Sequence, residues 1–495
     1  MQHPDDGLCP PAGRTGSPDG ESGYYTRLNP ADGTVASRVP AHGVKAAVAA
    51  VNAAARAFPG WSGQPAAARR AVLDRAAGLI DGYAPEIARL MRAEIGATDD
   101  WVRFNLDIAR RHLETAADLT EHIGGGVRRD AEGLQMCFRD PVGVCLAIAP
   151  WNAPFVLGMR AVATALACGN TVVLKASENC PAMHMLIGRV LAEAGFLPEG
   201  ALGIVTHAPD LSEEIVTALI AHDAVRRVNF TGSTRVGRIV AELAGRHLKR
   251  CLLELGGKAP FIVLEDADLD AAADAAAFGS FFNQGQICMA TDRIIVMEQV
   301  ADAFAQRLAA LARNLRAGDP MLGGYALGPM VSEGVAQRIE DMVADAVAKG
   351  AMVLAGGARR GPYVDAVVLD RVEPGMMIYA EECFGPVAAI CRVQSEAEAI
   401  GIANDTRYGL SGAVFGRDIA HALGVARRID SGMCHVNAPT LNDRPDMPVG
   451  GVKDSGFGRF GGVQMLDEFT ETRWIDIARA PRRTGFGRPD SGAGI

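Results

Sequence analysis

Short apolar runs alternate with stretches of helical spacing between residues 142 and 257, and this alternation restricts the possible folds more than any other feature. The runs are VGVCLAIAP (142–150), TVVLKAS (171–177), LGIVTH (202–207), VRRVNFTGS (225–233) and CLLELGG (251–257). Strands that are apolar throughout are typical of parallel sheets buried on both faces, and helix-length connections between them are typical of crossovers. The pattern therefore predicts a doubly wound parallel sheet, the α/β class of fold.

A second series of the same kind follows, through APFIV, RIIVM, MVLAGG and AVVLD, and it predicts a second α/β domain. The two domains are expected at 23–122 together with 142–256, and at 257–455. The first residues are polar, acidic and rich in Pro and Gly, and the last are basic and Gly-rich. We therefore expect a disordered tail at 1–22 and a flexible tail at 481–495.

Composition excludes several functional classes. The chain has 49% hydrophobic residues, which fits a soluble globular protein, and a net charge of −9, which disfavours nucleic-acid and anionic-membrane partners. It has neither a signal-like apolar segment nor about 18 consecutive apolar residues, so a cytoplasmic protein is expected. The ten cysteines form no CxxC pair, which predicts reduced thiols and no metal site.

Cys288 lies in the polar, glycine-broken segment FNQGQIC, directly after an apolar stretch. A cysteine that only fills a core needs no polar neighbours, whereas a nucleophilic thiol needs access to its substrate and a route for its proton. Gly285 would permit an irregular loop there, and Asn283, Gln284 and Gln286 supply polar groups. On this segment alone, both roles remain open.

Other polar residues stand where apolar runs end. Glu254, in CLLELGGK, is expected to be paired, protonated or at work as a general base, because a buried lone carboxylate is costly. Asn152, in PWNAPF, could face a ligand or cap the following helix. Gly232 and Gly237, in NFTGSTRVG, span a turn that would suit a phosphate, although a glycine pair is a weak signal.

Together, PWNAPF, LKASE, FTGST, LELGGK, FNQGQIC, EECFGPV and MPVGGVKDSGFGR resemble, in this order, the motifs of the NAD(P)-dependent aldehyde dehydrogenase superfamily. The resemblance extends from about Tyr25 to Arg473. It implies a Rossmann-like NAD-binding domain (23–122 and 142–256), a catalytic domain (257–455) and a β oligomerisation arm (123–141 and 468–480). It also implies a homodimer or homotetramer.

The resemblance assigns chemical roles to three residues. Cys288 would be the nucleophile that forms a thiohemiacetal and then a thioester. Glu254 would activate the water that releases the acid, which favours hydrolysis over transfer to coenzyme A. Asn152, with the backbone NH of Cys288, would form the oxyanion hole.

The same resemblance assigns the cofactor site. Lys175 and Glu178 would contact the adenosine ribose, and the Glu178 carboxylate favours NAD over NADP because it would repel a 2′-phosphate. Gly232 and Ser233 would lie on the pyrophosphate side, and Glu382 and Phe384 would hold the nicotinamide ribose and ring. Trp151 is a further residue expected at the cofactor. A solvated turn carboxylate is the alternative for Glu382.

Within the superfamily, the chain is most similar to bacterial salicylaldehyde, vanillin and benzaldehyde dehydrogenases, on PWNAPFVLGMRAVATALACGNTVVLKASE and the CHVNAPT segment. This similarity implies an aromatic aldehyde as substrate. Arg160 would either face a ring hydroxyl or form a salt bridge between domains or subunits. Trp101 would either line the substrate pocket or pack in the core. Phe155 and Phe457 are further pocket candidates.

Three other functions remain open at this point. The first is oxidation of an aliphatic aldehyde or semialdehyde, with Arg160 binding a distal carboxylate. The second, from a different class, is a catalytically silent relative that binds a dinucleotide. A thiol esterase that works without any dinucleotide is a further possibility.

Overall fold

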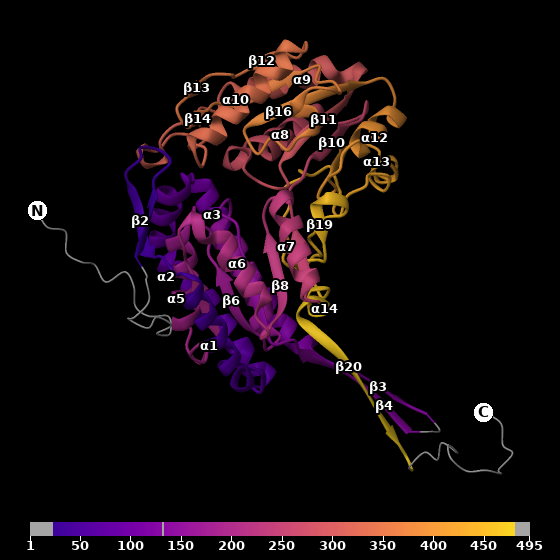
Figure 1. Ribbon diagram of the computed structural model, residues 1–495. Helices are drawn as coiled ribbons and strands as arrows, with labels where there is room; N and C mark the ends of the chain where they lie inside the picture. The colour runs from indigo at the N-terminus through magenta and orange to yellow at the C-terminus, as the bar shows by residue number, and fades with distance from the viewer. Residues whose placement is uncertain (1–22, 131–132, 481–495) are drawn as a thin grey trace, which may run out of the picture.

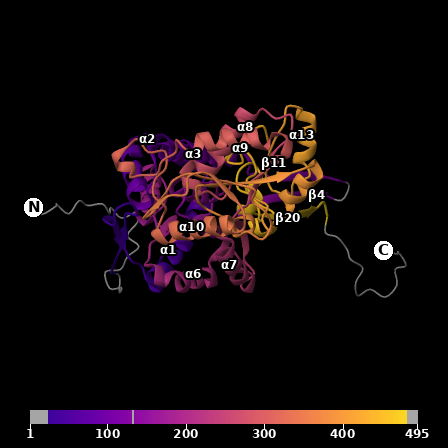
Figure 2. The same ribbon diagram turned by 90° about the horizontal axis from the view of Figure 1, so that it is seen from above.

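Two α/β domains and a narrow antiparallel arm make up the protein (Figure 1). The computed structural model describes residues 23–130 and 133–480, and the tails expected at 1–22 and 481–495 lie outside the described residues. In Figures 1 and 2, arm strands β4 (Gly133–Pro141) and β20 (Thr470–Ala478) leave the body on the side away from α2 (Ala66–Ile95). No helix in the described part of the chain combines the length and apolarity that a membrane span requires.

The parallel sheet predicted for the first domain is confirmed, because every one of the apolar runs between residues 142 and 257 forms a strand. These strands are β5 (Val144–Ile148), β6 (Thr171–Lys175), β7 (Leu202–Val205), β8 (Val225–Thr231) and β9 (Arg250–Glu254). Their spatial order is β9-β8-β5-β6-β7, and β19 (Gly456–Phe457) joins β9 antiparallel at the edge. The chain reverses its direction across the sheet between β5 and β8, and such a switch point is where open α/β sheets bind ligands.

Alternation along the strands assigns the helices to two faces of this sheet. On β9, Leu252 faces the core cluster of one side and Leu253 faces the cluster of the other. The first side carries α2, α3 (Asp99–Leu119), α4 (Pro154–Ala167) and α5 (Pro181–Glu193). The second side carries α1 (Val44–Ser62), α6 (Ser212–Ala221) and α7 (Thr234–Arg246). Glu254 lies two residues after Leu252 on the same strand, so its side chain points to the same face of the sheet, the one covered by α4.

The second domain contains the predicted second sheet, with spatial order β12-β15-β16-β11-β10-β17-β18. In chain order its strands are β10 (Ala259–Val263), β11 (Thr291–Met297), β12 (Met352–Ala355), β15 (Val367–Asp370), β16 (Val387–Val393), β17 (Ala413–Phe415) and β18 (His435–Val436). All neighbours are parallel except β12 with β15. One face packs on α8 (Leu269–Phe281) and α9 (Glu298–Ala312), and the other on α12 (Glu396–Asn404) and α13 (Ile419–Ala426).

Smaller elements complete the described fold. They are the hairpin β1 (Tyr24–Leu28) with β2 (Val35–Pro40), the hairpin β13 (Arg359–Arg360) with β14 (Tyr363–Val364), and the helices α10 (Glu333–Ala348), α11 (Met377–Ala380) and α14 (Met465–Phe469). The first hairpin packs on α2, and α14 returns the chain to α4 of the first domain.

The arm is a three-stranded antiparallel sheet in which β4 pairs with β20 and with β3 (Gly126–Arg129). It joins two segments that lie more than 300 residues apart, since Gln135 Nε2 donates to Asp476 Oδ1 across a separation of 341 residues. Its surface is apolar at several points, and Trp474 on β20 is 67% exposed. The role of the arm in oligomerisation stays a prediction.

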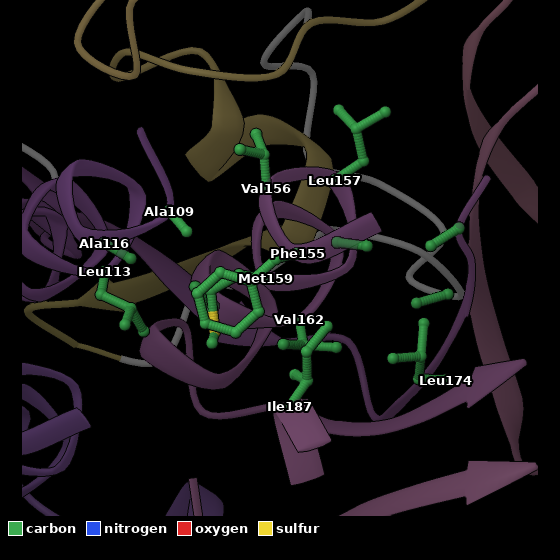
Figure 3. Packing of buried hydrophobic residues seen from close by; sticks show 14 of the residues in the cluster. Ala109, Leu113, Ala116, Phe155, Val156, Leu157, Met159, Val162, Leu174 and Ile187 are labelled. Carbon is green, nitrogen blue, oxygen red and sulfur yellow. The ribbon is translucent and has the colours of Figure 1, made fainter. Parts of the chain in front are cut away.

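Helix α4 is buried along its entire length, and it forms the centre of the first domain. Phe155 lies among core residues that include Met159, Val162 and Ile187 (Figure 3). A Cβ atom on Gly158 would stand 2.4 Å from Cδ1 of Ile187, so α4 and α5 pack closely there. Phe155, one of the residues expected to line the substrate pocket, is therefore placed in the hydrophobic core.

Truncation of this core residue should affect stability and leave substrate binding intact. Phe155→Ala is expected to lower the free energy of unfolding by about 3–5 kcal/mol, because it opens a cavity in a packed core. Phe457, which is 52% exposed on β19, provides the control, and Phe457→Ala should change stability by less than about 0.5 kcal/mol. Urea denaturation measures both. A raised KM for the aldehyde in Phe155→Ala without loss of stability would contradict this assignment.

Candidate active site

The candidate site lies where the ends of the two sheets approach each other. From the first domain, Asn152 follows β5, Gly232 follows β8 and Glu254 ends β9, all at the carboxyl edge of the sheet. From the second domain, Cys288 precedes β11 and Glu382 precedes β16, both at the amino edge of that sheet. Residues from distant parts of the sequence therefore converge in one place between the domains.

Cys288 and Glu254 are in direct contact. The Cys288 thiol donates a hydrogen bond to Glu254 Oε1 over 2.9 Å. Cys288 is half-buried, whereas Glu254 is buried, with 1% of its surface exposed. Burial and the carboxylate of Glu254 raise the pKa of the Cys288 thiol well above its ordinary value. The thiol therefore needs a base to become a nucleophile, and the acceptor it already contacts is a carboxylate.

The loop before Cys288 has an unusual backbone. Asn283, Gln284 and Gly285 have φ values of 48°, 57° and 68°, so consecutive residues lie in the left-handed region. Such a conformation in a non-glycine residue is costly and persists only where surrounding contacts impose it. Gln284 Nε2 donates to Pro329 O over 3.2 Å, and Gln286 Oε1 accepts from Val331 N over 3.0 Å. The polar residues of FNQGQIC thus anchor a strained loop that presents the cysteine.

Asn152 is tied to the same loop. Its Nδ2 donates to Gln286 O over 2.9 Å, and its backbone carbonyl accepts from Asn283 Nδ2 over 3.2 Å. The helix-cap alternative is not realised, because α4 begins at Pro154 after Ala153 and has no side-chain cap. The Asn152 amide is thereby fixed beside the segment that carries Cys288.

A close backbone approach brings the two domains together at this point. A Cβ atom on Gly257 would stand 2.3 Å from the carbonyl oxygen of Cys288, so only glycine fits. Gly257 lies in the connection between β9 of the first domain and β10 of the second, so this contact packs the connection against Cys288. Within the second domain, a Cβ atom on Gly285 would stand 2.1 Å from the carbonyl oxygen of Gly385. The glycines in LELGGK and FNQGQIC are therefore required for close backbone packing around Cys288.

Arg160 is the counterion of Glu254. It reaches from α4 to form an ion pair with Glu254 Oε2, and Nη2 also donates to Thr231 Oγ1 over 3.0 Å. Its guanidinium carbon lies 4.2 Å from the centre of the Phe460 ring. Of the roles expected for Arg160, the structure shows a salt bridge, but one inside the first domain and not between domains or subunits.

Aromatic side chains form a continuous cluster beside the catalytic loop. Trp101 stacks on Phe104 with ring centres 5.0 Å apart, and its edge meets Phe282 at 5.1 Å. Phe282 stacks in turn on Phe278 at 4.8 Å. Trp101 is only 1% exposed and donates from Nε1 to Asn152 O over 2.8 Å, so it supports the Asn152 turn from the core.

A cavity of about 620 Å³ adjoins this cluster. It is lined by Phe104, Phe278, Leu441 and Asp443, among others, and Phe457 does not border it. Phe104, Phe278 and Phe282 were missed from the sequence, although the pair Trp101 and Phe104 has helical i, i+3 spacing. The fourth candidate, Phe457, lies on β19 with its side chain half exposed.

The residues expected at the adenosine ribose are neighbours. Lys175 Nζ lies 3.3 Å from Glu178 Oε2 at the end of β6. Burial acts to raise the pKa of Glu178, but the Lys175 ammonium and a backbone NH outweigh it and lower that pKa. Gly232 N donates to Glu254 O over 3.1 Å, and Ser233 caps α7 by accepting from Val236 N over 3.4 Å. An ionised carboxylate and a helix amino end therefore line the same edge of the sheet.

The residues expected at the nicotinamide end also lie together. Glu382 Oε1 accepts from Gly257 N over 3.0 Å, and burial raises the pKa of Glu382 to about 7. The rings of Trp151 and Phe384 meet edge to face with centres 5.8 Å apart. Glu382 is thus not a solvated turn carboxylate.

A buried ion pair fixes the loop that carries Glu382 and Phe384. Lys258 Nζ lies 3.0 Å from Asp292 Oδ1, and Asp292 Oδ2 accepts from Cys383 N over 3.0 Å. Sequence reasoning missed this pair. The only signal was a lysine directly after the two glycines of LELGGK.

Comparison with known proteins identifies the fold and the family. Residues 18–475 match the aldehyde dehydrogenase family. The chain is 49% identical to vanillin dehydrogenase of Pseudomonas fluorescens over 460 residues, which are 92% of this chain and 95% of that protein. It is 39% identical over 442 residues to a Pseudomonas putida benzaldehyde dehydrogenase whose name specifies NAD(+), which covers 88% of this chain and 90% of that one.

A solved structure agrees with these relatives. The crystal structure of salicylaldehyde dehydrogenase from Pseudomonas putida G7 with salicylaldehyde superposes with a TM-score of 0.92 at 45% identity, over 95% of this chain and 97% of that one. The chain therefore belongs to the aldehyde dehydrogenase family. It is an enzyme that oxidises an aldehyde to the acid, in a family that uses NAD(P).

Gly257 offers a direct test of the close approach between the domains. Gly257→Ala should push the Cys288 backbone away and lower kcat by about a hundredfold, the typical effect of a shift of about 1 Å at a reacting group. Gly78→Ala on α2, where an added Cβ meets nothing within 4 Å, should leave kcat unchanged. Steady-state kinetics with matched thermal unfolding measures both. Unchanged kcat in Gly257→Ala would contradict the geometry.

Proposed function

We propose that this enzyme oxidises an aromatic aldehyde to its carboxylic acid with NAD, through a thioester on Cys288. The observation that carries the proposal is the contact between the Cys288 thiol and Glu254 Oε1 beside an aromatic cluster and its adjoining cavity. The vanillin, salicylaldehyde and benzaldehyde dehydrogenases among its relatives support the aromatic substrate.

In the first step, Cys288 gives its proton to Glu254 and Sγ attacks the aldehyde carbon. A carbon–sulfur bond forms, and the carbonyl electron pair moves to the oxygen. Asn152 is suited to stabilise that oxygen, because its amide nitrogen carries two hydrogens and Gln286 O accepts only one. Together with the backbone NH of Cys288 it would form the oxyanion hole.

The dinucleotide, when bound, supplies the acceptor for the hydride that leaves the substrate carbon. Lys175 and Glu178 provide a donor and an acceptor for ribose hydroxyls. Gly232 and Ser233 lie at the amino end of α7, which suits a pyrophosphate. The remaining residues that would hold the cofactor are Trp151, Glu382 and Phe384. The ionised Glu178 supports NAD over NADP, since it would repel a 2′-phosphate.

Before the last step, Glu254 releases to solvent the proton that it took from Cys288. It then takes a proton from water, and the hydroxide attacks the thioester. The carbon–sulfur bond breaks, the acid leaves, and Sγ takes that proton from Glu254, which regenerates the Cys288 thiol. Glu254 can reach this bond because Oε1 already lies 2.9 Å from Sγ. A water-activating carboxylate at this position supports hydrolysis rather than transfer to coenzyme A.

The alternatives fit the geometry less well. A semialdehyde substrate would need Arg160 for its distal carboxylate, but that guanidinium is already paired with Glu254. A silent dinucleotide-binding relative would have no need for a thiol in contact with a buried carboxylate. A homodimer or homotetramer formed through the arm is supported by the exposed apolar residues Val127, Trp474 and Ile477.

A panel of aldehydes tests the proposal. Purified enzyme with benzaldehyde, salicylaldehyde, vanillin, hexanal or succinic semialdehyde, each with NAD or NADP, should form reduced dinucleotide fastest with a ring aldehyde and NAD. Cys288→Ala should abolish the reaction. A preference for succinic semialdehyde would contradict the aromatic substrate, and no reaction with any aldehyde would contradict catalysis altogether.

A further inference from the structure

Arg160 and Glu254 form a buried pair with few other contacts. Arg160 is 2% exposed and Glu254 1%, so neither charge is solvated by bulk water. The guanidinium contacts Glu254, Thr231 and the face of the Phe460 ring, and its Nε is buried without a hydrogen-bond partner. Its contacts are therefore directed at the carboxylate at the end of β9.

The pair sets the orientation of the carboxylate as well as its charge. Arg160 takes Oε2, which leaves Oε1 for the Cys288 thiol. A buried carboxylate without a cation tends to take up a proton, and a cation within hydrogen-bond distance opposes this. A protonated Glu254 could accept neither the proton of Cys288 nor that of a water molecule.

We propose that Arg160 is a positioning residue that holds Oε1 of Glu254 against Cys288, and that it does not bind the aldehyde. The inference rests on the cysteine chemistry of the proposed function, but it is independent of whether the substrate is aromatic. It replaces the substrate contact expected for Arg160 from the sequence.

The other charged groups around the pair do not supply this function. Asp443 acts on Arg160 from the 441–446 loop, and His112 Nε2 on α3 lies 3.7 Å from Asp443 Oδ1. The charge of Glu382 also acts to raise the pKa of Cys288. Burial acts to lower the pKa of Arg160, but Glu254 and Asp443 outweigh it and raise that pKa, so Arg160 stays charged as pH changes. Within residues 23–130 and 133–480, Arg160 is the only cation in direct contact with Glu254.

Arg160→Met is the main test, because it removes the charge and roughly keeps the volume. We expect kcat/KM at neutral pH to fall about a hundredfold, and by the same factor for benzaldehyde, salicylaldehyde and hexanal. Without the guanidinium, Oε1 of Glu254 is no longer held against the thiol. The loss should therefore fall on kcat, while KM for each aldehyde stays near its original value.

Three further variants separate positioning from folding. Arg160→Lys retains the charge without the planar fork, so it should restore part of the kcat that Arg160→Met loses. Thr231→Val removes only the hydroxyl that holds Arg160 and should lower kcat by less, again without a change in KM, which tests the inference even if Arg160→Met does not fold. Arg69→Met is the matched control. Arg69 is also buried against α4, where its Nε donates to Ala167 O, and its loss should leave kcat and KM unchanged.

Two results would overturn the inference. One is a loss confined to salicylaldehyde, because it would place Arg160 on the ring hydroxyl. The other is a fall in kcat in Arg160→Met that Arg160→Lys does not partly restore and that Thr231→Val does not share, because it would indicate a structural role only. If the unmodified enzyme oxidises hexanal but no ring aldehyde, the aromatic proposal fails while the Arg160 test proceeds with hexanal.

Discussion

The structure of the site depends on one buried carboxylate that is held between two partners. Glu254 ends a central strand on the face covered by α4, where water cannot solvate it. Its two oxygens are satisfied by a cation from α4 and a thiol from the other domain. A carboxylate in this position is costly without both partners, so the fold of the first domain and the docking of the second are coupled to the chemistry.

Close backbone contact makes that docking possible. Gly257 and Gly285 leave no room for a side chain against Cys288 and Gly385, and Asn283 and Gln284 hold a left-handed backbone against its intrinsic preference. Hydrogen bonds from the side chains of Asn283 and Gln284 compensate for this strain. The polar segment around Cys288 therefore fixes the position of Sγ. Asn152 contributes to this by its hydrogen bond to Gln286 O.

Sequence reasoning was most successful for features that depend on residues close together in the chain. The apolar runs predicted the strands of the first sheet, because strand periodicity and crossover length can be read from short segments of sequence. Contacts between separate segments of the chain could not be predicted in this way, and the pairs Arg160 with Glu254 and Lys258 with Asp292 are examples. Phe155 was misassigned for the same reason, since an aromatic residue on a helix buried on all sides has no sequence signal that separates pocket from core. Family motifs added the catalytic roles, which periodicity alone could not provide.

The most direct test of the account is the mass of the enzyme after a single turnover. Glu254→Gln, incubated with NAD and a ring aldehyde at alkaline pH, where hydroxide can take the Cys288 proton in place of Glu254, and then quenched in acid, should carry one acyl group on the peptide that contains Cys288. The acyl group should accumulate because the water-activating carboxylate is gone. Peptide mass mapping identifies the site. An acyl group on another cysteine, or full turnover to free acid by Glu254→Gln, would contradict the central role of the Cys288 and Glu254 pair.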